Sequence, residues 1–296
     1  MRSRKESVVT GKQTPDGKEV RLYPPPPKDF DPFAATEKDL MRHGLPLRPD
    51  PQTQPGMAGL WERQATRYRS FDHLEPRPDT TTAAKKAVAA PALGLDSTES
   101  CGYQLFSSSA PFTALFVTWT VPNLQFTPSP IGVNHFRTFV GLGFFLDVHV
   151  EMTVDSAQNV TAQIWAQNVG DINLPVRPGD VISGSLCLQT NQAGTASYFL
   201  ANETTLQTIN FAVDTGVLPA VTINAGVTRS WPLNQPFPPL AGFGVVYFDD
   251  ISAYTTSDPR SLTSGEAITM VDQNGRTLAR PLRLNDWTFK TVFAAA

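Results

Sequence analysis

Apolar and polar residues alternate along the second two thirds of the chain, and this pattern predicts strands. We expect a strand over Phe112–Val121, in which every second residue from Leu115 to Val121 is apolar and which Pro122 ends, as is typical of a half-buried strand. We expect further strands over Phe136–Leu146, Val148–Val154, Val160–Gln167, Val181–Leu188, Thr195–Leu200, Leu206–Val213, Phe243–Phe248, Ala267–Val271 and Trp287–Phe293. About ten strands without helices between them predict a sandwich or barrel.

Three of these strands are joined by short turns. The segment Arg177–Asp180 contains proline, glycine and aspartate, and we expect it to form a tight turn because these residue types favour one. We expect a second turn at Asn191–Gly194. The polar segment Asn202–Thr205 follows the second strand. The stretch Val176–Phe211 therefore predicts an antiparallel meander, on which a second layer packs.

Phe136–Leu146 differs from the other predicted strands because it is apolar at consecutive positions and contains Gly141 and Gly143. Strands covered on both faces lose the alternation, and glycines inside a strand often mark a close approach of another group. We expect a central strand at this place.

The first ninety-odd residues have a different composition. They are rich in proline, and Pro24–Pro27 is restricted to an extended conformation. Thr36–Gly44 and Met57–Tyr68 are expected to form short helices, the second docking through Trp61. Thr80–Leu95 is expected to link this arm to the body. The predicted domains are an arm over residues 1–98 and a β-domain over residues 99–296. A partner-binding arm or pro-segment and a solvated linker both fit the arm's composition.

Charge and cysteine content exclude several classes of protein. Residues 101–296 carry 8 Lys and Arg against 13 Asp and Glu, so the body lacks the basic surface of a nucleic-acid-binding protein. With only Cys101 and Cys187, at most one disulfide is possible, and two free thiols are the simpler interpretation.

No apolar run is long enough for a membrane span or a secretory signal. The cellular location is not determined. Neither metal-ligand spacing nor a cofactor motif is present.

Several segments of the body, in the right order, resemble those of the eqolisins, or glutamic peptidases. The matching segments are Thr118–Asn123, Phe139–Gly143, Pro178–Ile182, Ala201–Thr205, Gly242–Phe248 and Ile268–Asp272. The resemblance covers residues 99–293 and implies a two-sheet antiparallel β-sandwich of the concanavalin-like type. The leader of the chain, with Gly44–Pro51 and Trp61, also looks like leaders of bacterial members. Family members are often secreted.

The resemblance also implies where catalytic residues should lie. In the family a glutamate acts as general acid and base on a water molecule, and a glutamine positions that water, both on the concave face of one sheet. The glutamine's strand matches Val150–Asp155, and the glutamate's segment matches Arg229–Pro236. Glu151 thus replaces the glutamine, and Ser230 replaces the glutamate. Phe139, Gly143, Trp165 and Trp231 are the expected binding residues, although Trp165, Trp231, Phe139 and Tyr198 also suit a core.

Serine without a base neither stores nor accepts a proton usefully, so the sequence predicts an inactive family member. Our first hypothesis is a binding or assembly module that uses the concave face and the arm, for a polypeptide or another chain-like ligand. The alternatives are an acid endopeptidase that uses Glu151 and a structural subunit whose arm lies on a neighbouring molecule. A nucleophilic triad of Asp147, His149 and Ser230 is disfavoured because no nucleophile elbow surrounds Ser230.

Overall fold

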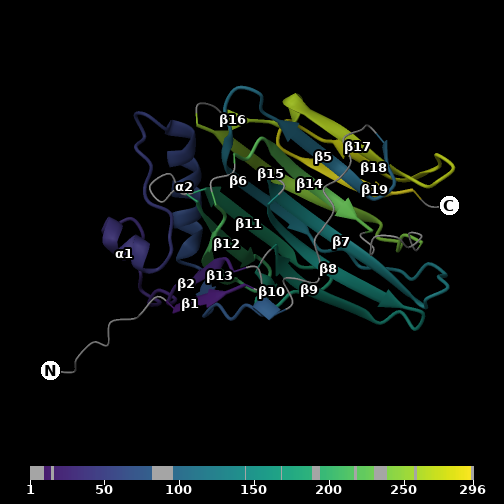
Figure 1. Cartoon of the computed structure of the whole chain (residues 1–296), viewed down its shortest axis with the longest axis horizontal. Helices are drawn as coiled ribbons and strands as arrows, with labels where there is room; N and C mark the ends of the chain where they lie inside the picture. The colour runs from purple at the N-terminus through teal and green to yellow at the C-terminus, as the bar shows by residue number, and fades with distance from the viewer. Residues whose placement is uncertain are drawn as a thin grey trace.

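Two layers of antiparallel strands form the body of the protein in a computed structural model. The structure describes residues 10–14, 17–81, 96–143, 145–167, 169–188, 194–216, 219–229, 239–256 and 259–294. The two layers are joined edge to edge at the hairpin between β17 (Gly265–Val271) and β18 (Thr277–Arg283) (Figure 1). The sequence prediction of an all-β sandwich is confirmed.

The first sheet contains, in spatial order, β18 (Thr277–Arg283), β19 (Phe289–Phe293), β15 (Val245–Thr255), β6 (Phe112–Thr120), β11 (Val181–Leu188), β12 (Thr195–Asn202) and β13 (Gln207–Asp214). The second sheet contains β17 (Gly265–Val271), β5 (Ser100–Phe106), β14 (Thr222–Thr228), β7 (Val133–Leu142), β8 (Leu146–Asp155), β9 (Val160–Ala166) and β10 (Gly170–Ile172). Smaller elements are β4 (Asp96–Ser97), β16 (Pro259–Arg260) and the 3-10 helix Leu262–Ser264.

The core lies between the two sheets and takes every second residue of their strands. Its largest side chains are fully buried and include Trp119, Phe136, Tyr198, Phe248 and Phe289. Trp119 donates its indole N–H to Thr138 Oγ1 across the layers at 2.9 Å, so the polar atom of this large side chain is satisfied.

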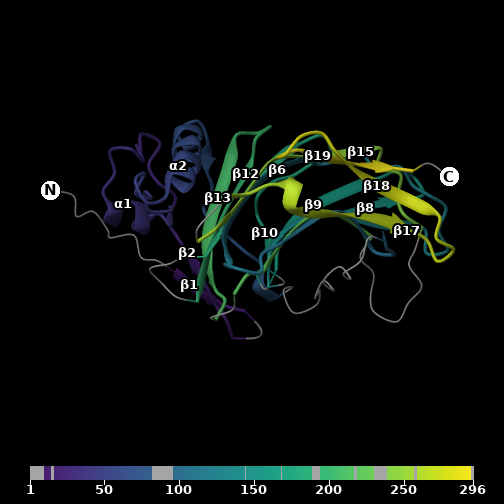
Figure 2. The ribbon, with the colours of Figure 1, turned by 90° about the horizontal axis from the view of Figure 1, so that it is seen from above.

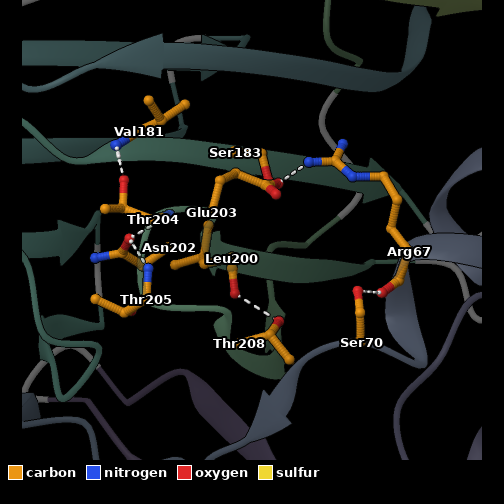
Figure 3. A network of polar contacts seen from close by, with 10 residues as sticks. All are labelled: Arg67, Ser70, Val181, Ser183, Leu200, Asn202, Glu203, Thr204, Thr205 and Thr208. Atoms are coloured by element: carbon orange, nitrogen blue, oxygen red, sulfur yellow. Dashed lines mark hydrogen bonds and ion pairs between the residues drawn. The ribbon is translucent and has the colours of Figure 1, made fainter.

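The predicted meander is present as β11, β12 and β13. Gly179 has a φ of 90° in the turn before β11, a conformation that glycine adopts without strain. The Asp180 carboxylate accepts hydrogen bonds from Arg177 N and Asn202 Nδ2 at 2.8 and 2.7 Å. Asn202 Oδ1 in turn accepts the backbone N–H groups of Thr204 and Thr205 (Figure 3). Side-chain bonds therefore fix both turns that carry the family-like motifs.

The strand boundaries depart from the prediction in several places. β5, β10, β14 and β18 were not among the predicted strands, and the expected strand Phe136–Leu146 ends at Leu142, because a turn separates β7 from β8. The expected strand Phe243–Phe248 begins at Val245 and continues to Thr255, so Asp249 and Asp250 lie inside β15 rather than after a strand. A register shift and a φ of 49° at Asp250 accommodate them. β14 was not predicted, because Thr222–Thr228 is short and half polar. Pairing with β5 and β7 on its two sides nevertheless makes it a central strand.

The arm packs on the body of its own chain. β1 (Thr10–Gln13) pairs with β2 (Glu19–Leu22), and β2 adds to the edge of the first sheet at β13. Helices α1 (Glu37–Arg42) and α2 (Pro55–Tyr68) lie outside β12 and β13 (Figure 2). No helix within the described ranges is long and apolar enough to span a membrane.

Apolar packing and one ion pair hold α2 against the first sheet. Trp61 and Tyr68 are buried with Leu40 in a second apolar cluster, against which Phe199 of β12 packs. The Arg67 guanidinium pairs with the Glu203 carboxylate, which also accepts a hydrogen bond from Ser183 Oγ at 2.6 Å (Figure 3). The prediction that α2 docks through Trp61 agrees with this packing.

The arm also bridges the open side of the sandwich. β3 (Asp72–His73) pairs in parallel with β13 of the first sheet. A few residues later, Asp79 N donates to Asp171 O of β10 at 2.9 Å, and Arg77 N donates to Asn173 Oδ1 at 2.6 Å. One short segment thus connects the free edges of both sheets.

Acid should weaken this attachment through His73. Burial lowers the pKa of His73 from 6.5 to about 4. Between these pH values, His73 is protonated in the unfolded chain and neutral in the folded protein. The free energy of unfolding should therefore fall between about pH 6.5 and about pH 4, by about 2 kcal/mol for a partly exposed ring. Urea unfolding of the unchanged protein and of the His73→Gln variant at several pH values checks this. Equal pH dependence in the two proteins would contradict it.

Candidate functional site

The outer face of the second sheet carries the candidate site. Residues directly opposite each other in antiparallel strands share a face, and the alternate residues of these strands fill the core. We name the opposite side the polar face. Its members in the middle of the sheet are Gly102, Gln104, Arg137, Phe139, Gly141, Asp147, His149, Glu151, Gln163, Trp165, Asn224, Gly226 and Thr228.

Aromatic side chains and glycines form the central row of this face. Phe139, His149 and Trp165 are opposite one another on β7, β8 and β9, and the rings of His149 and Trp165 are parallel to within 5°. The row continues to Gly226 and Gly102. A Cβ at either glycine would collide with the backbone of the neighbouring strand. The close approach of β5 and β14 therefore requires these glycines, which contribute no side chains beside Phe139.

A buried ion pair lies one row away. Arg137 and Glu151 are opposite each other on β7 and β8, with Arg137 Nη2 3.7 Å from Glu151 Oε1 and side chains only 8% and 11% exposed. Arg137 Nη1 is also buried and has no hydrogen-bond partner. An adjacent guanidinium favours the ionised form of a carboxylate. Glu151 therefore lies next to a cation in the folded protein.

Gln163, which the sequence analysis did not single out, lies opposite Glu151 on β9. Its Nε2 donates to Asp171 Oδ2 at 2.5 Å. Burial raises the pKa of Asp171, and the nearby Asp79 carboxylate raises it further, whereas the bond from Gln163 opposes both. A carboxylate and an amide therefore face each other across β8 and β9. Only the strand register identifies this pair, because the two residues lie on different strands.

Several polar atoms on the other side of the central row are buried without hydrogen bonds. Asp147 Oδ1 is 3.5 Å from His149 Nδ1, and neither atom makes a hydrogen bond. Gln104 Nε2 and Asn224 Oδ1 are likewise unsatisfied, although these residues are only 1% and 5% exposed. Buried polar groups in folded proteins are nearly always paired, so this concentration on one face indicates a place for a ligand.

The structure brings together three of the predicted site residues. Glu151, Phe139 and Trp165 share the polar face. Gly143 lies in the turn after β7 with a φ of 69°, and Tyr198 belongs to the core between the sheets.

Two predicted positions, Ser230 and Trp231, fall outside the described residues. The separation of Glu151 from Ser230, and the disfavoured triad with Asp147 and His149, are therefore not described.

The cysteines do not take part in this site. Cys101 and Cys187 are both free, and burial raises the pKa of the Cys101 thiol to about 12, which suppresses its reactivity. Among the described side chains, no three His, Cys, Asp or Glu residues are grouped to hold a metal ion.

Together, the two joined layers and the acidic and amide side chains on one sheet face define a sandwich of the glutamic-peptidase type. The model of the Peptidase A4 family matches residues 98–287, and the chain belongs to this family, the eqolisins. The resemblance inferred from the sequence is confirmed.

Solved structures agree on the fold. Scytalido-glutamic peptidase with a transition-state analogue inhibitor is 17% identical with a TM-score of 0.54, over 67% of this chain and 98% of that chain. SCP-B, an eqolisin in complex with the tripeptide Ala-Ile-His, has the same identity, TM-score and coverage. No curated protein matches the chain.

The Arg137–Glu151 pair gives a prediction about stability. Arg137→Gln should lower the free energy of unfolding by about 3 kcal/mol, because removing one partner leaves a buried charge uncompensated. Arg137→Gln/Glu151→Gln should be more stable than Arg137→Gln alone, since it removes both charges. Urea unfolding at neutral pH measures both effects. If the double variant loses as much unfolding free energy as the single variants Arg137→Gln and Glu151→Gln lose together, the two charges do not interact.

Proposed function

We propose that this family member binds an extended polypeptide on the polar face without cleaving it. The observation that carries the proposal is the Arg137–Glu151 ion pair at the position where the family resemblance places a neutral glutamine. The neutral amide that should position water and stabilise the oxyanion is replaced by a carboxylate bound to a guanidinium.

The chemical consequence follows from the charges. An oxyanion needs a hydrogen-bond donor, and a carboxylate repels it, so the exchange costs about a hundredfold or more in rate. An ion-paired carboxylate is also a weaker proton acceptor than a free one. The position matched to the family's glutamate, Ser230, supplies no acid or base. Both halves of the family's chemistry are thereby lost.

Binding is retained in this proposal because the face still offers what an extended chain requires. Gln104 and Asn224 present a buried donor and a buried acceptor without partners, and backbone peptide groups carry both functions. Phe139 on the neighbouring strand β7 and Trp165 further along the same face add apolar side chains. The complex of the eqolisin SCP-B with a tripeptide supports a peptide as the ligand class.

A second candidate is an acid endopeptidase in which the roles are exchanged. The observation that favours it is the placement of Gln163 directly opposite Glu151. Glu151 would act on water, and the Gln163 amide would hold the oxyanion. Against this, Gln163 Nε2 already donates to Asp171, and Arg137 neutralises Glu151.

Incubation with denatured casein from about pH 3 to about pH 7, the range in which carboxyl catalysis operates, distinguishes the two candidates. We expect no cleavage by the purified protein at any pH, measured by mass spectrometry of the soluble peptides. We also expect the intact protein to bind the same substrate in a pull-down.

The control for this experiment is a pair of matched variants. Glu151→Gln removes the carboxylate beside Arg137, whereas Glu266→Gln removes an exposed carboxylate on β17 of the same sheet. Cleavage that disappears in Glu151→Gln and persists in Glu266→Gln, with Glu151→Gln shown to be folded by its urea unfolding midpoint, would overturn the proposal and establish the peptidase.

A further inference from the structure

We propose that Asp147 and Asn224 bind the side chain of a lysine or arginine, so that the ligand of the polar face is a basic extended polypeptide. This inference rests on the proposed function and specifies its ligand. The three residues that define the place are Asp147 on β8, Gly141 opposite it on β7 and Asn224 opposite Gly141 on β14.

The unsatisfied atoms of Asp147 and Asn224 are acceptors, so a ligand at this place must supply hydrogen-bond donors. Asp147 Oδ1 and Asn224 Oδ1 are acceptors, and both are buried without a hydrogen bond. Lysine and arginine side chains carry several N–H donors and no acceptor. A bond from a cation to the Asp147 carboxylate would be charge-assisted and thus stronger than a neutral one.

The strand register places a glycine between the two acceptors. Asp147 and Asn224 are two strands apart, which corresponds to about 10 Å between their backbones. Gly141 lies between them and contributes no side chain. An ammonium or guanidinium group over Gly141 would therefore have an acceptor on each side. The adjacent rings of Phe139 and Trp165 would cover its apolar stem.

The charge balance of the whole sheet agrees with a cationic ligand. Among the described strands β5, β7, β8, β9, β10, β14 and β17, Arg137 is the only lysine or arginine. The carboxylates of the same strands are Asp147, Glu151, Asp155, Asp171 and Glu266. Because Glu151 is paired with Arg137, the remaining carboxylates leave this sheet net negative, which attracts basic chains and repels acidic ones.

The test uses three fluorescent peptides of about twelve residues, long enough to cross the sheet, with alternating Lys-Ser, Gln-Ser and Glu-Ser sequences. Fluorescence anisotropy at about 0.15 M salt measures their affinities. We expect the Lys-Ser peptide to bind about tenfold more tightly than the Gln-Ser peptide, the order of one charge-assisted hydrogen bond. The Glu-Ser peptide should bind least.

Variants locate the effect. Asp147→Asn should weaken Lys-Ser binding about tenfold and leave Gln-Ser binding unchanged. Asn224→Leu, which removes the second acceptor, should also weaken Lys-Ser binding. The matched control is Asp155→Asn on the same strand, whose carboxylate already accepts bonds from Ala157 and Asn159, and it should weaken Lys-Ser binding much less than Asp147→Asn does. Urea unfolding midpoints verify that each variant is folded.

The outcomes separate this inference from the function on which it rests. Equal affinity for the three peptides, or an equal loss in Asp147→Asn and Asp155→Asn, would overturn the basic ligand while the binding function stands. Binding of none of them would overturn both. The chain itself contains Lys85 and Lys86. If the double variant Lys85→Ala/Lys86→Ala binds the Lys-Ser peptide about tenfold more tightly, the protein's own lysines compete for the site. This result would overturn the inference that the ligand is a separate basic chain.

Discussion

The antiparallel register of β7, β8 and β14 is the constraint on which both the core and the candidate site depend. Val148 and Val150 point into the core with no exposed surface, so Asp147, His149 and Glu151 must point to the other side of the same strand. A slip of one residue would exchange the two sets and bury carboxylates among apolar side chains. The apolar core thus fixes which polar residues meet on the polar face.

The fold was predictable because alternation and turn chemistry are local signals. Leu115–Val121 and the turn Arg177–Asp180 each indicate their structure without reference to distant residues. The pairing of Glu151 with Arg137 and with Gln163 was not predictable, because it depends on how three strands align. β14 was missed for the same reason: its polar composition is tolerated only because β5 and β7 supply its hydrogen bonds.

The polar face combines residue types that the family's chemistry also uses, but in a different order. In the alignment that we propose, the acid Glu151 takes the position of the family's glutamine, and the amide Gln163 lies opposite it. We propose that the contacts of these two side chains distinguish the arrangement from a working acid–amide pair. Arg137 neutralises the acid, and Asp171 occupies the amide donor. These two contacts are the reason for which we propose ligand binding rather than proton transfer on this face.

The arm belongs to this arrangement rather than to a separate spacer. Asp79 donates its backbone N–H to Asp171, and its carboxylate contributes to the raised pKa of Asp171. Asp171 in turn binds Gln163, the residue opposite Glu151. Polar contacts therefore run from the arm to Gln163, and the Asp79 carboxylate of the arm contributes to the charge environment of this part of the polar face. Because the same segment joins the free edges of both sheets through β13 and β10, detaching it would alter the electrostatics and the rim of the face together.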